Sequence, residues 1–240
     1  MTWLPRVAFA TVTFRVRSVR RYPVKSMGGE TLDRVTLDSR GLGGDRWFAV
    51  EDDDGRFASG KDTRRFRRRD AVFDYVARTG SDGQVWVSRN GAEWMVGDPR
   101  LDGDVSKRMG CAARVRPEAG VPHQDMGAVS IIGTATLDWC SHAWGGDGDG
   151  RRLRVNVVIE TIEPFIEETW LGRKLQVGTA ALVVAERTPR CRMIDVSQDG
   201  TAPTAHWLKG VARDRDMLLA VYADVRSPGR FRVGDQVDVQ

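Results

Sequence analysis

The chain has 240 residues, and its 37 Lys and Arg residues exceed its 33 Asp and Glu residues by four, so its weak net charge does not by itself require nucleic acid. No apolar stretch reaches the roughly 18 residues of a membrane span, and three scattered cysteines cannot form a zinc or iron–sulfur site. This composition predicts a cytoplasmic, enzyme-like protein with a well-buried core.

The first hundred residues predict a mostly antiparallel β-structure. Val12, Phe14 and Val16 alternate with polar residues, as in a half-buried strand. The arginine-rich, acid-poor N-terminus is also typical of a transit peptide, but we favour the strand. Hairpin turns are expected at Asp82-Gly83 and Asn90-Gly91. The predicted strands cover residues 14–19, 33–37, 47–51, 71–76, 85–88 and 94–96.

The second half predicts further strands with a few short helices. A strand over 128–132 precedes a helix over 134–144, for which Thr134 is the candidate N-cap. Helical turns are expected at 163–169 and 205–211. The remaining predicted strands cover residues 155–160, 180–187, 218–225 and 236–239. The simplest architecture is a mainly β (α+β) fold made of two β-rich halves that share a core.

Cys191 is the strongest candidate for chemistry. It follows a predicted strand, in a turn made by Pro189, and lies between Arg190 and Arg192. Neighbouring guanidinium groups favour the thiolate, which is the form that binds soft metals or attacks electrophiles. The alternative is a small buried hydrophobic residue. Cys111 and Cys140 occupy sequences typical of packing positions.

Four further clusters place basic or hydrogen-bonding groups where predicted strands end, which is where a scaffold presents ligand-binding groups. Taken singly, each is also typical of a solvated charge or a turn residue. The clusters are Pro23-Val24-Lys25-Ser26, Gly44-Asp45-Arg46-Trp47, Arg154-Val155-Asn156 and Thr134.

Residues 64–69, with the sequence RRFRRR, form the most basic stretch. The stretch is a candidate for contacts with nucleic acid or an acidic partner. A solvated hairpin loop is favoured, because the stacking aromatic residues of single-strand binders do not interleave with it. The three histidines are isolated, and the glycines at 41–44 lack the lysine and helix of a phosphate-binding loop.

Several motifs in order resemble the MOSC family, which is named for the C-terminal domain of molybdenum-cofactor sulfurase. The resemblance is greatest to its two-part members, which are related to the mitochondrial amidoxime reducing component. The matching motifs are VRRYPVKS at 19–26, GLGGDRW at 41–47, FASGK at 57–61, VSIIGTATL at 129–137, RLRVNVVI at 152–159, PFIEETW at 164–170 and TPRC at 188–191.

The resemblance implies a MOSC N-terminal β-barrel domain over 12–105 and a MOSC β-barrel domain over 106–240, with a cofactor groove between them. It implies that Cys191 is the protein ligand to molybdenum and that a pyranopterin with a terminal phosphate occupies the groove. The implied cofactor-binding residues are Lys25, Ser26, Arg46, Trp47, Thr134, Arg154, Asn156, Thr188 and Arg190.

The activity implied by the resemblance is reduction of the N–O bond of a small N-hydroxylated substrate. The chain has too few cysteines for an iron–sulfur cluster, so we expect a separate electron donor such as a ferredoxin or flavoprotein. Loops around 98–104, 116–126 and 198–206 are expected to face the substrate.

Two alternatives to this activity stay open. Cys191 could carry a persulfide in sulfur transfer, or the basic stretch could make the chain a non-catalytic binding module. We expect no nucleic-acid or membrane partner.

Overall fold

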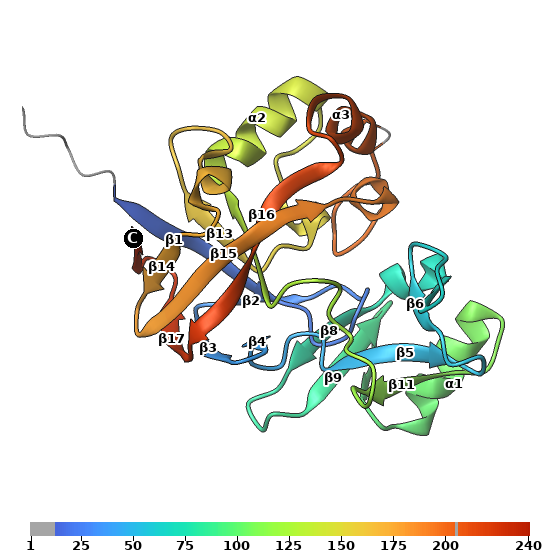
Figure 1. The fold of residues 1–240 in the computed structure, drawn as a ribbon. Helices are drawn as coiled ribbons and strands as arrows, with labels where there is room; N and C mark the ends of the chain where they lie inside the picture. Colours follow the sequence, from blue (N-terminus) through green and yellow to red (C-terminus); the bar gives the residue numbers. More distant parts are fainter. Residues whose placement is uncertain (1–12, 205) are drawn as a thin grey trace, which may run out of the picture.

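The computed structural model describes residues 13–204 and 206–240. Strands dominate the structure, which confirms the predicted mainly β class (Figure 1). Val12 and Ala205, which the sequence assigned to a strand and a helical turn, lie outside the described residues. Within the described residues, no helix is long and apolar enough to cross a membrane.

Seven strands close a barrel in the order β13-β12-β16-β15-β14-β18-β1, with β1 pairing back to β13. Neighbours are antiparallel except β12 and β13, which are parallel and joined by a crossover that contains α2 (Thr134–Trp144). A short strand, β2 (Glu30–Leu32), pairs antiparallel with the C-terminal end of β1. The barrel strands are β1 (Phe14–Arg21), β12 (Val129–Gly133), β13 (Val157–Glu160), β14 (Lys174–Val177), β15 (Ala180–Pro189), β16 (Leu218–Ser227) and β18 (Gln236–Val239).

The first described strand of the chain therefore completes a barrel built mostly from the second half. Val16 and Val19 of β1 are buried in the barrel core although they are three residues apart. A bulge in the pairing with β13 between Val16 and Ser18 explains this spacing, because the extra residue turns Val19 to the inner face. Val16, Val19, Val35, Leu37 and Leu42 of the first half therefore belong to the barrel core, whereas most other buried apolar residues of that half form a second core, so the prediction of one shared core holds only in part.

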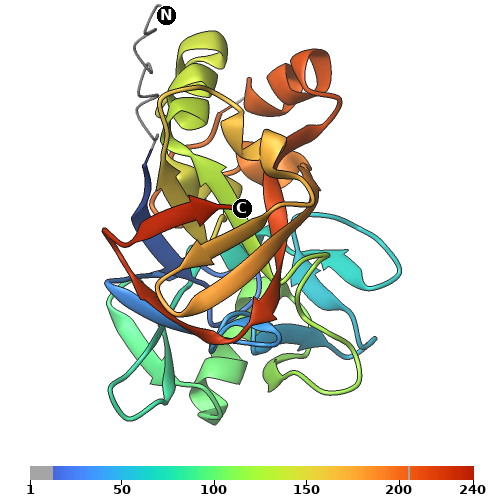
Figure 2. The ribbon, with the colours of Figure 1, turned by 60° about the vertical axis from the view of Figure 1, so that its left-hand side comes forward.

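The smaller N-terminal region has a separate core, which lies beside the barrel (Figures 1 and 2). Two sheets surround this core, with the orders β11-β5-β6-β7 and β10-β9-β8. A third sheet pairs β17 with β3 and β4, and its buried side chains pack in the barrel core instead. Their bounds are β3 (Arg34–Asp38), β4 (Gly41–Leu42), β5 (Phe48–Asp52), β6 (Phe57–Ser59), β7 (Phe66–Arg68), β8 (Val76–Thr79), β9 (Val85–Arg89), β10 (Ala92–Met95), β11 (Ala113–Pro117) and β17 (Gly229–Arg232). The predicted Asn90-Gly91 hairpin joins β9 to β10.

Two predictions in this region are wrong. Residues 71–76 form a 3-10 helix, η1 (Asp70–Asp74), and the start of β8, because an apolar run this short fits either conformation. The segment around 98–104 belongs to a helix, α1 (Pro99–Met109), that packs in the core. Its signals were present in the sequence: Asp98 caps its N-terminus, Pro99 follows, and Gly110 ends it in a left-handed conformation.

Helices α2 and α3 (Trp207–Asp214) pack together over one end of the barrel, through the rings of Trp144 and Trp207 (Figure 1). The N-cap of α2 is Gly133 rather than Thr134, whose hydroxyl exchanges hydrogen bonds with the backbone of Thr161. Three more 3-10 helices are η2 (Gly150–Leu153), η3 (Ile166–Trp170) and η4 (Arg192–Asp195).

Candidate functional site

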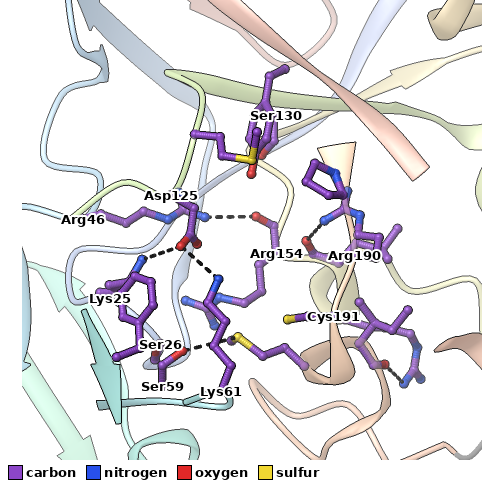
Figure 3. Close-up of a pocket in the computed structure, with 18 of the residues that line it drawn as sticks. Lys25, Ser26, Arg46, Ser59, Lys61, Asp125, Ser130, Arg154, Arg190 and Cys191 are labelled. Atoms are coloured by element: carbon purple, nitrogen blue, oxygen red, sulfur yellow. Dashed lines mark hydrogen bonds and ion pairs between the residues drawn. The ribbon is translucent and has the colours of Figure 1, made fainter. Parts of the chain in front are cut away.

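A cavity of about 270 Å³ is lined by residues of both the barrel and the N-terminal region (Figure 3). Seven of its lining residues are basic, whereas Asp125 is the one carboxylate that the described residues contribute to the lining. This charge imbalance favours an anionic ligand. The basic residues are Lys25, Arg46, Lys61, Arg65, Arg152, Arg154 and Arg190.

Four of these residues form a guanidinium cluster, namely Arg46, Arg152, Arg154 and Arg190, and each of them donates to a backbone carbonyl group. Arg190 Nε donates to Leu219 O at 2.8 Å and its Nη1 donates to Leu153 O at 2.9 Å. Arg154 Nη2 donates to Met27 O at 2.8 Å. Because neither Arg154 nor Arg190 pairs with a carboxylate of the described residues, both positive charges stay uncompensated.

The environment of Arg190 shows the cost of this arrangement. Burial lowers the pKa of Arg190 to about 10, and its Nη2 atom is shielded from water without a hydrogen-bond partner among the described residues. A buried charge without a counterion is unfavourable unless an anion reaches it. The cavity is therefore electrostatically prepared for a negative group.

The ring of Tyr22 packs against two members of the guanidinium cluster, Arg46 and Arg154. The ring is fully buried and lies 4.2 Å from the Arg154 guanidinium carbon and 5.1 Å from that of Arg46. Arg46 in turn pairs with the buried Asp45 and donates to Arg154 O at 3.2 Å. The aromatic face attracts both cations. This packing fixes their positions before any ligand binds.

Three lining residues, Ser26, Arg46 and Arg154, have left-handed backbone conformations, with φ of 69°, 55° and 54°. Such conformations are uncommon outside glycine and persist only where the surrounding structure enforces them. Here the enforcement includes the backbone bonds Arg46 N to Tyr22 O and Arg154 N to Arg151 O. Three of the nine described non-glycine residues with positive φ thus line the cavity.

The remaining three cations, Lys25, Lys61 and Arg65, form a loop-facing cluster that holds the 118–128 loop between β11 and β12. Lys25 Nζ donates to His123 O at 2.6 Å and lies 3.2 Å from Asp125, while Lys61 Nζ lies 3.5 Å from the same carboxylate. Arg65 donates to Pro122 O. These cations contact a loop rather than the barrel.

Titration in the loop-facing cluster follows from burial and charge. Burial lowers the pKa of Lys25 to about 8, although Asp125 partly opposes the shift. Burial raises the pKa of Asp125, but Lys25, Lys61 and Arg46 outweigh that effect and hold the pKa below its ordinary value. Asp125 is therefore ionised at neutral pH.

Cys191 follows β15 and precedes η4, and Figure 3 shows its sulfur atom directed into the cavity. Arg192 anchors this turn to the N-terminal region, because its Nη1 donates to Gly60 O at 3.0 Å. Gly60 approaches the segment after Cys191 closely, because an added Cβ would lie 2.8 Å from Met193 Cγ. The turn that carries the thiol thus packs against the residue that follows β6.

The other two cysteines lie away from the cavity. Burial raises the pKa of Cys140 to about 12, and it also raises the pKa of Cys111. Both thiols therefore stay protonated at neutral pH. Of the three, Cys191 alone lines the cavity.

The structure brings six of the residues expected from the sequence into the cavity wall: Lys25, Ser26, Arg46, Arg154, Arg190 and Cys191. Four others lie outside the wall. Trp47 is 44% exposed on the surface, and Thr134 is engaged with Thr161. Thr188 is buried, and its hydroxyl has no partner among the described residues.

Asn156 does not line the cavity, but it is hydrogen-bonded to a residue that does. Its Oδ1 accepts hydrogen bonds from the Ser130 amide at 3.1 Å and from the Ser130 hydroxyl at 2.9 Å. Ser130 lines the cavity, so the hydrogen bonds from Ser130 to Asn156 fix the position of a lining residue.

Sequence reasoning missed several lining residues. Lys61 and Arg152 lay within quoted motifs, and Arg65 lay within the basic stretch, but no local signal assigned any of them to the site. Of the loops expected to face the substrate, 116–126 supplies Asp125 and Met126. Residues from 98–104 and the described part of 198–206 do not line the cavity.

Comparisons with known proteins agree with this architecture. The model of the MOSC N-terminal beta barrel domain matches residues 13–106, and the MOSC domain model matches residues 104–238. No curated protein sequence matches the chain.

Solved structures are similar to this chain at low sequence identity. The YuaD protein of Bacillus subtilis is 13% identical with a TM-score of 0.50, and the match covers 95% of this chain and 96% of that one. YiiM of Escherichia coli is 10% identical with a TM-score of 0.44, over 95% of this chain and 70% of that one. Because the MOSC domain model alone covers more than half of the residues, this chain belongs to the MOSC family, which is linked to molybdenum-cofactor binding.

Proposed function

We propose that the cavity binds the molybdenum cofactor with Cys191 as the protein ligand to the metal. We further propose that the chain is an oxidoreductase that reduces the N–O bond of an N-hydroxylated substrate. The observation that carries the proposal is a thiol directed into a cavity whose wall has seven cations and one carboxylate.

The residues present fit this cofactor in two respects. A thiolate is a soft ligand of the kind that holds molybdenum, and Cys191 is the cavity's cysteine. A terminal phosphate would compensate the charges of Arg154 and Arg190, which pair with no carboxylate of the described residues. Guanidinium groups suit phosphate oxygens because they donate two parallel hydrogen bonds.

Each group of residues has a distinct task in the proposed site. Lys25, Arg46, Arg154 and Arg190 would hold the phosphate, and the Ser26 hydroxyl, which makes no hydrogen bond to the described residues, would donate to the cofactor. When bound, the cofactor supplies the two-electron redox chemistry at its metal. The protein contributes a fixed thiolate and a prepared positive field.

The overall reaction sets the requirement for electrons. Cleaving one N–O bond of an N-hydroxylated substrate consumes two electrons and two protons and releases the reduced nitrogen product and water. Three cysteines are too few to hold a four-cysteine iron–sulfur cluster in this chain. We therefore propose that a separate protein, such as a ferredoxin or flavoprotein, supplies the electrons.

Metal and pterin analysis tests cofactor binding. The chain is expressed in a host that makes the cofactor, and molybdenum and pterin are measured for wild type, Cys191→Ser and the control Cys111→Ser. We expect roughly one equivalent of each in wild type and in the control, and loss of molybdenum from Cys191→Ser. Wild type without molybdenum or pterin would overturn the proposal, and a Cys191 persulfide without molybdenum would indicate sulfur transfer.

A turnover assay tests the reaction. An aryl amidoxime is supplied with reduced methyl viologen as the electron source, and formation of the amidine is measured. We expect turnover by wild type and none by Cys191→Ser. Molybdenum-loaded protein that reduces no N-hydroxylated compound would retain the cofactor assignment and reject the reductase.

A further inference from the structure

A basic surface with an apolar centre surrounds the mouth of the cavity. We define this mouth surface by Lys61, Arg64, Arg65 and Arg68 of the segment 61–68 together with Val121 and Met126 of the 118–128 loop. The contacts from Lys61 to Asp125 and from Arg65 to Pro122 O join its two parts. Figure 2 shows the segment around β6 and β7 projecting from one side of the molecule.

The positive charge of the chain is concentrated in this segment. Residues 61–70 contain six basic residues and two acidic ones, an excess of four that equals the net charge of the whole chain. Arg64 is exposed and makes no hydrogen bond or ion pair with the described residues, and the Arg65 guanidinium contacts a carbonyl rather than a carboxylate. Lys61, Arg67, Arg68 and Arg69 pair with carboxylates, so Arg64 and Arg65 are the basic residues of this segment whose charge meets no carboxylate of the described residues.

The adjoining loop supplies exposed apolar side chains. Val121 is 46% exposed and Met126 is 58% exposed. Apolar side chains, methionine among them, surrounded by polar groups are typical of a protein interface. Met126 also lines the cavity together with Cys191, so a protein bound at this surface would lie beside the proposed metal ligand.

We propose that the mouth surface is the docking site of an acidic electron-carrier protein, an inference that rests on the proposed reductase function. Charge complementarity identifies the partner's chemistry, because such encounters are steered by charge and bury little surface. A nucleic acid fits less well, since Phe66 is buried and offers no stacking surface to a base.

Docking at the mouth has a kinetic consequence. The carrier would cover the opening through which a small substrate reaches Cys191, so the two would bind in turn. We expect parallel double-reciprocal plots when carrier and substrate concentrations are varied together.

Charge reversal tests the docking site with reduced plant-type [2Fe–2S] ferredoxin, an acidic one-electron carrier, as the probe. We expect Arg64→Glu to lower the ferredoxin-driven kcat/KM for aryl amidoxime reduction by roughly tenfold at low ionic strength. The difference should disappear at high salt. Turnover with reduced methyl viologen should be unchanged, which separates docking from folding.

The matched control is Arg230→Glu, which reverses an exposed charge on β17, far from β6 in Figure 1. We expect the control to keep the wild-type ferredoxin rate. Equal losses in both variants, or none in Arg64→Glu, would overturn the docking site.

Binding of oxidised ferredoxin, measured by titration calorimetry, gives a readout that does not depend on molybdenum. If Arg64→Glu weakens this binding in protein that holds no cofactor, the docking site stands although the reductase fails. If loaded protein is active but binds ferredoxin equally with and without Arg64, the reductase stands and the docking site fails. Salt-dependent binding of an oligonucleotide that Arg64→Glu abolishes, with ferredoxin binding unaffected, would assign the surface to nucleic acid.

Discussion

The guanidinium cluster and the loop-facing cluster line the same cavity but are held in different ways. Arg154 and Arg190 donate to backbone carbonyl groups of Met27, Leu153 and Leu219, so their positions are set by the fold. The loop-facing cations instead contact the 118–128 loop, largely through Asp125 and backbone oxygens of the loop.

The guanidinium cluster therefore keeps its charge whether or not a ligand is bound, whereas the net charge of the loop-facing cluster depends on Asp125 and on the protonation of Lys25. A guanidinium fixed by carbonyl groups keeps its charge and its direction, and only an incoming anion compensates it. Lys25 is already paired with the partly exposed carboxylate of Asp125, so a bound ligand would replace one anion at Lys25 with another. We expect affinity to come mainly from the first cluster and pH dependence from the second.

The largest expected effect is on anion affinity after removal of a fixed charge. Arg154→Met should weaken binding of inorganic phosphate by about 100-fold, because a charged hydrogen-bonding group is lost from a desolvated site. Arg65→Met, which removes a loop-facing cation, should cost only a few-fold. Titration calorimetry measures both, and equal losses would erase the distinction between the clusters.

The next largest effect is on stability, through Gln198, whose side chain is hydrogen-bonded to two residues of the guanidinium cluster. Its side-chain amide donates to Arg152 O at 3.3 Å and to Met193 O, and its oxygen accepts from Arg154 Nη1 at 3.4 Å. Gln198→Ala should lower the free energy of unfolding by about 1–3 kcal/mol, because two buried carbonyls lose their donor. Urea unfolding measures it, and an unchanged midpoint would contradict this role.

The pH dependence of Lys25 gives a smaller effect. Between the folded pKa of about 8 and the ordinary value of 10.5, the unfolded chain keeps a proton that the folded chain has lost. Stability should therefore rise with pH in this window, and sulfate binding should weaken roughly tenfold between pH 7.5 and 9.5. Lys25→Arg stays charged and should bind sulfate equally at both values. A flat profile for wild type would show that Lys25 keeps its proton.

The smallest expected effect is a gain. Asp125→Asn removes the carboxylate that shares Lys25 and Lys61, so inorganic phosphate should bind a few-fold more tightly to the cofactor-free cavity. Asp54→Asn, which removes the partner of Arg67 outside the cavity wall, is the control. Weaker phosphate binding in Asp125→Asn would mean that Asp125 orders the cations rather than competes for them.

Much of the fold and part of the candidate site could be predicted from local sequence patterns. Alternation along β1 and the Asn90-Gly91 turn were readable because strand period and turn chemistry are properties of neighbouring residues. Cys191 between two arginines was readable for the same reason. The helix α1 was missed although its cap residues were present, because its three buried residues, Leu101, Val105 and Met109, leave a sparse apolar pattern.

The sequence by itself determined the strand pattern, the excess of charge in residues 61–70 and the candidate thiol. Only the tertiary structure decided that Lys61, Arg65 and Arg152 share a cavity with Cys191, and that Thr134 does not. These residues meet through strand pairings and loop contacts between positions that are distant in the chain. Such contacts leave no periodic trace, because their partners are set by how the barrel closes and not by neighbouring residues.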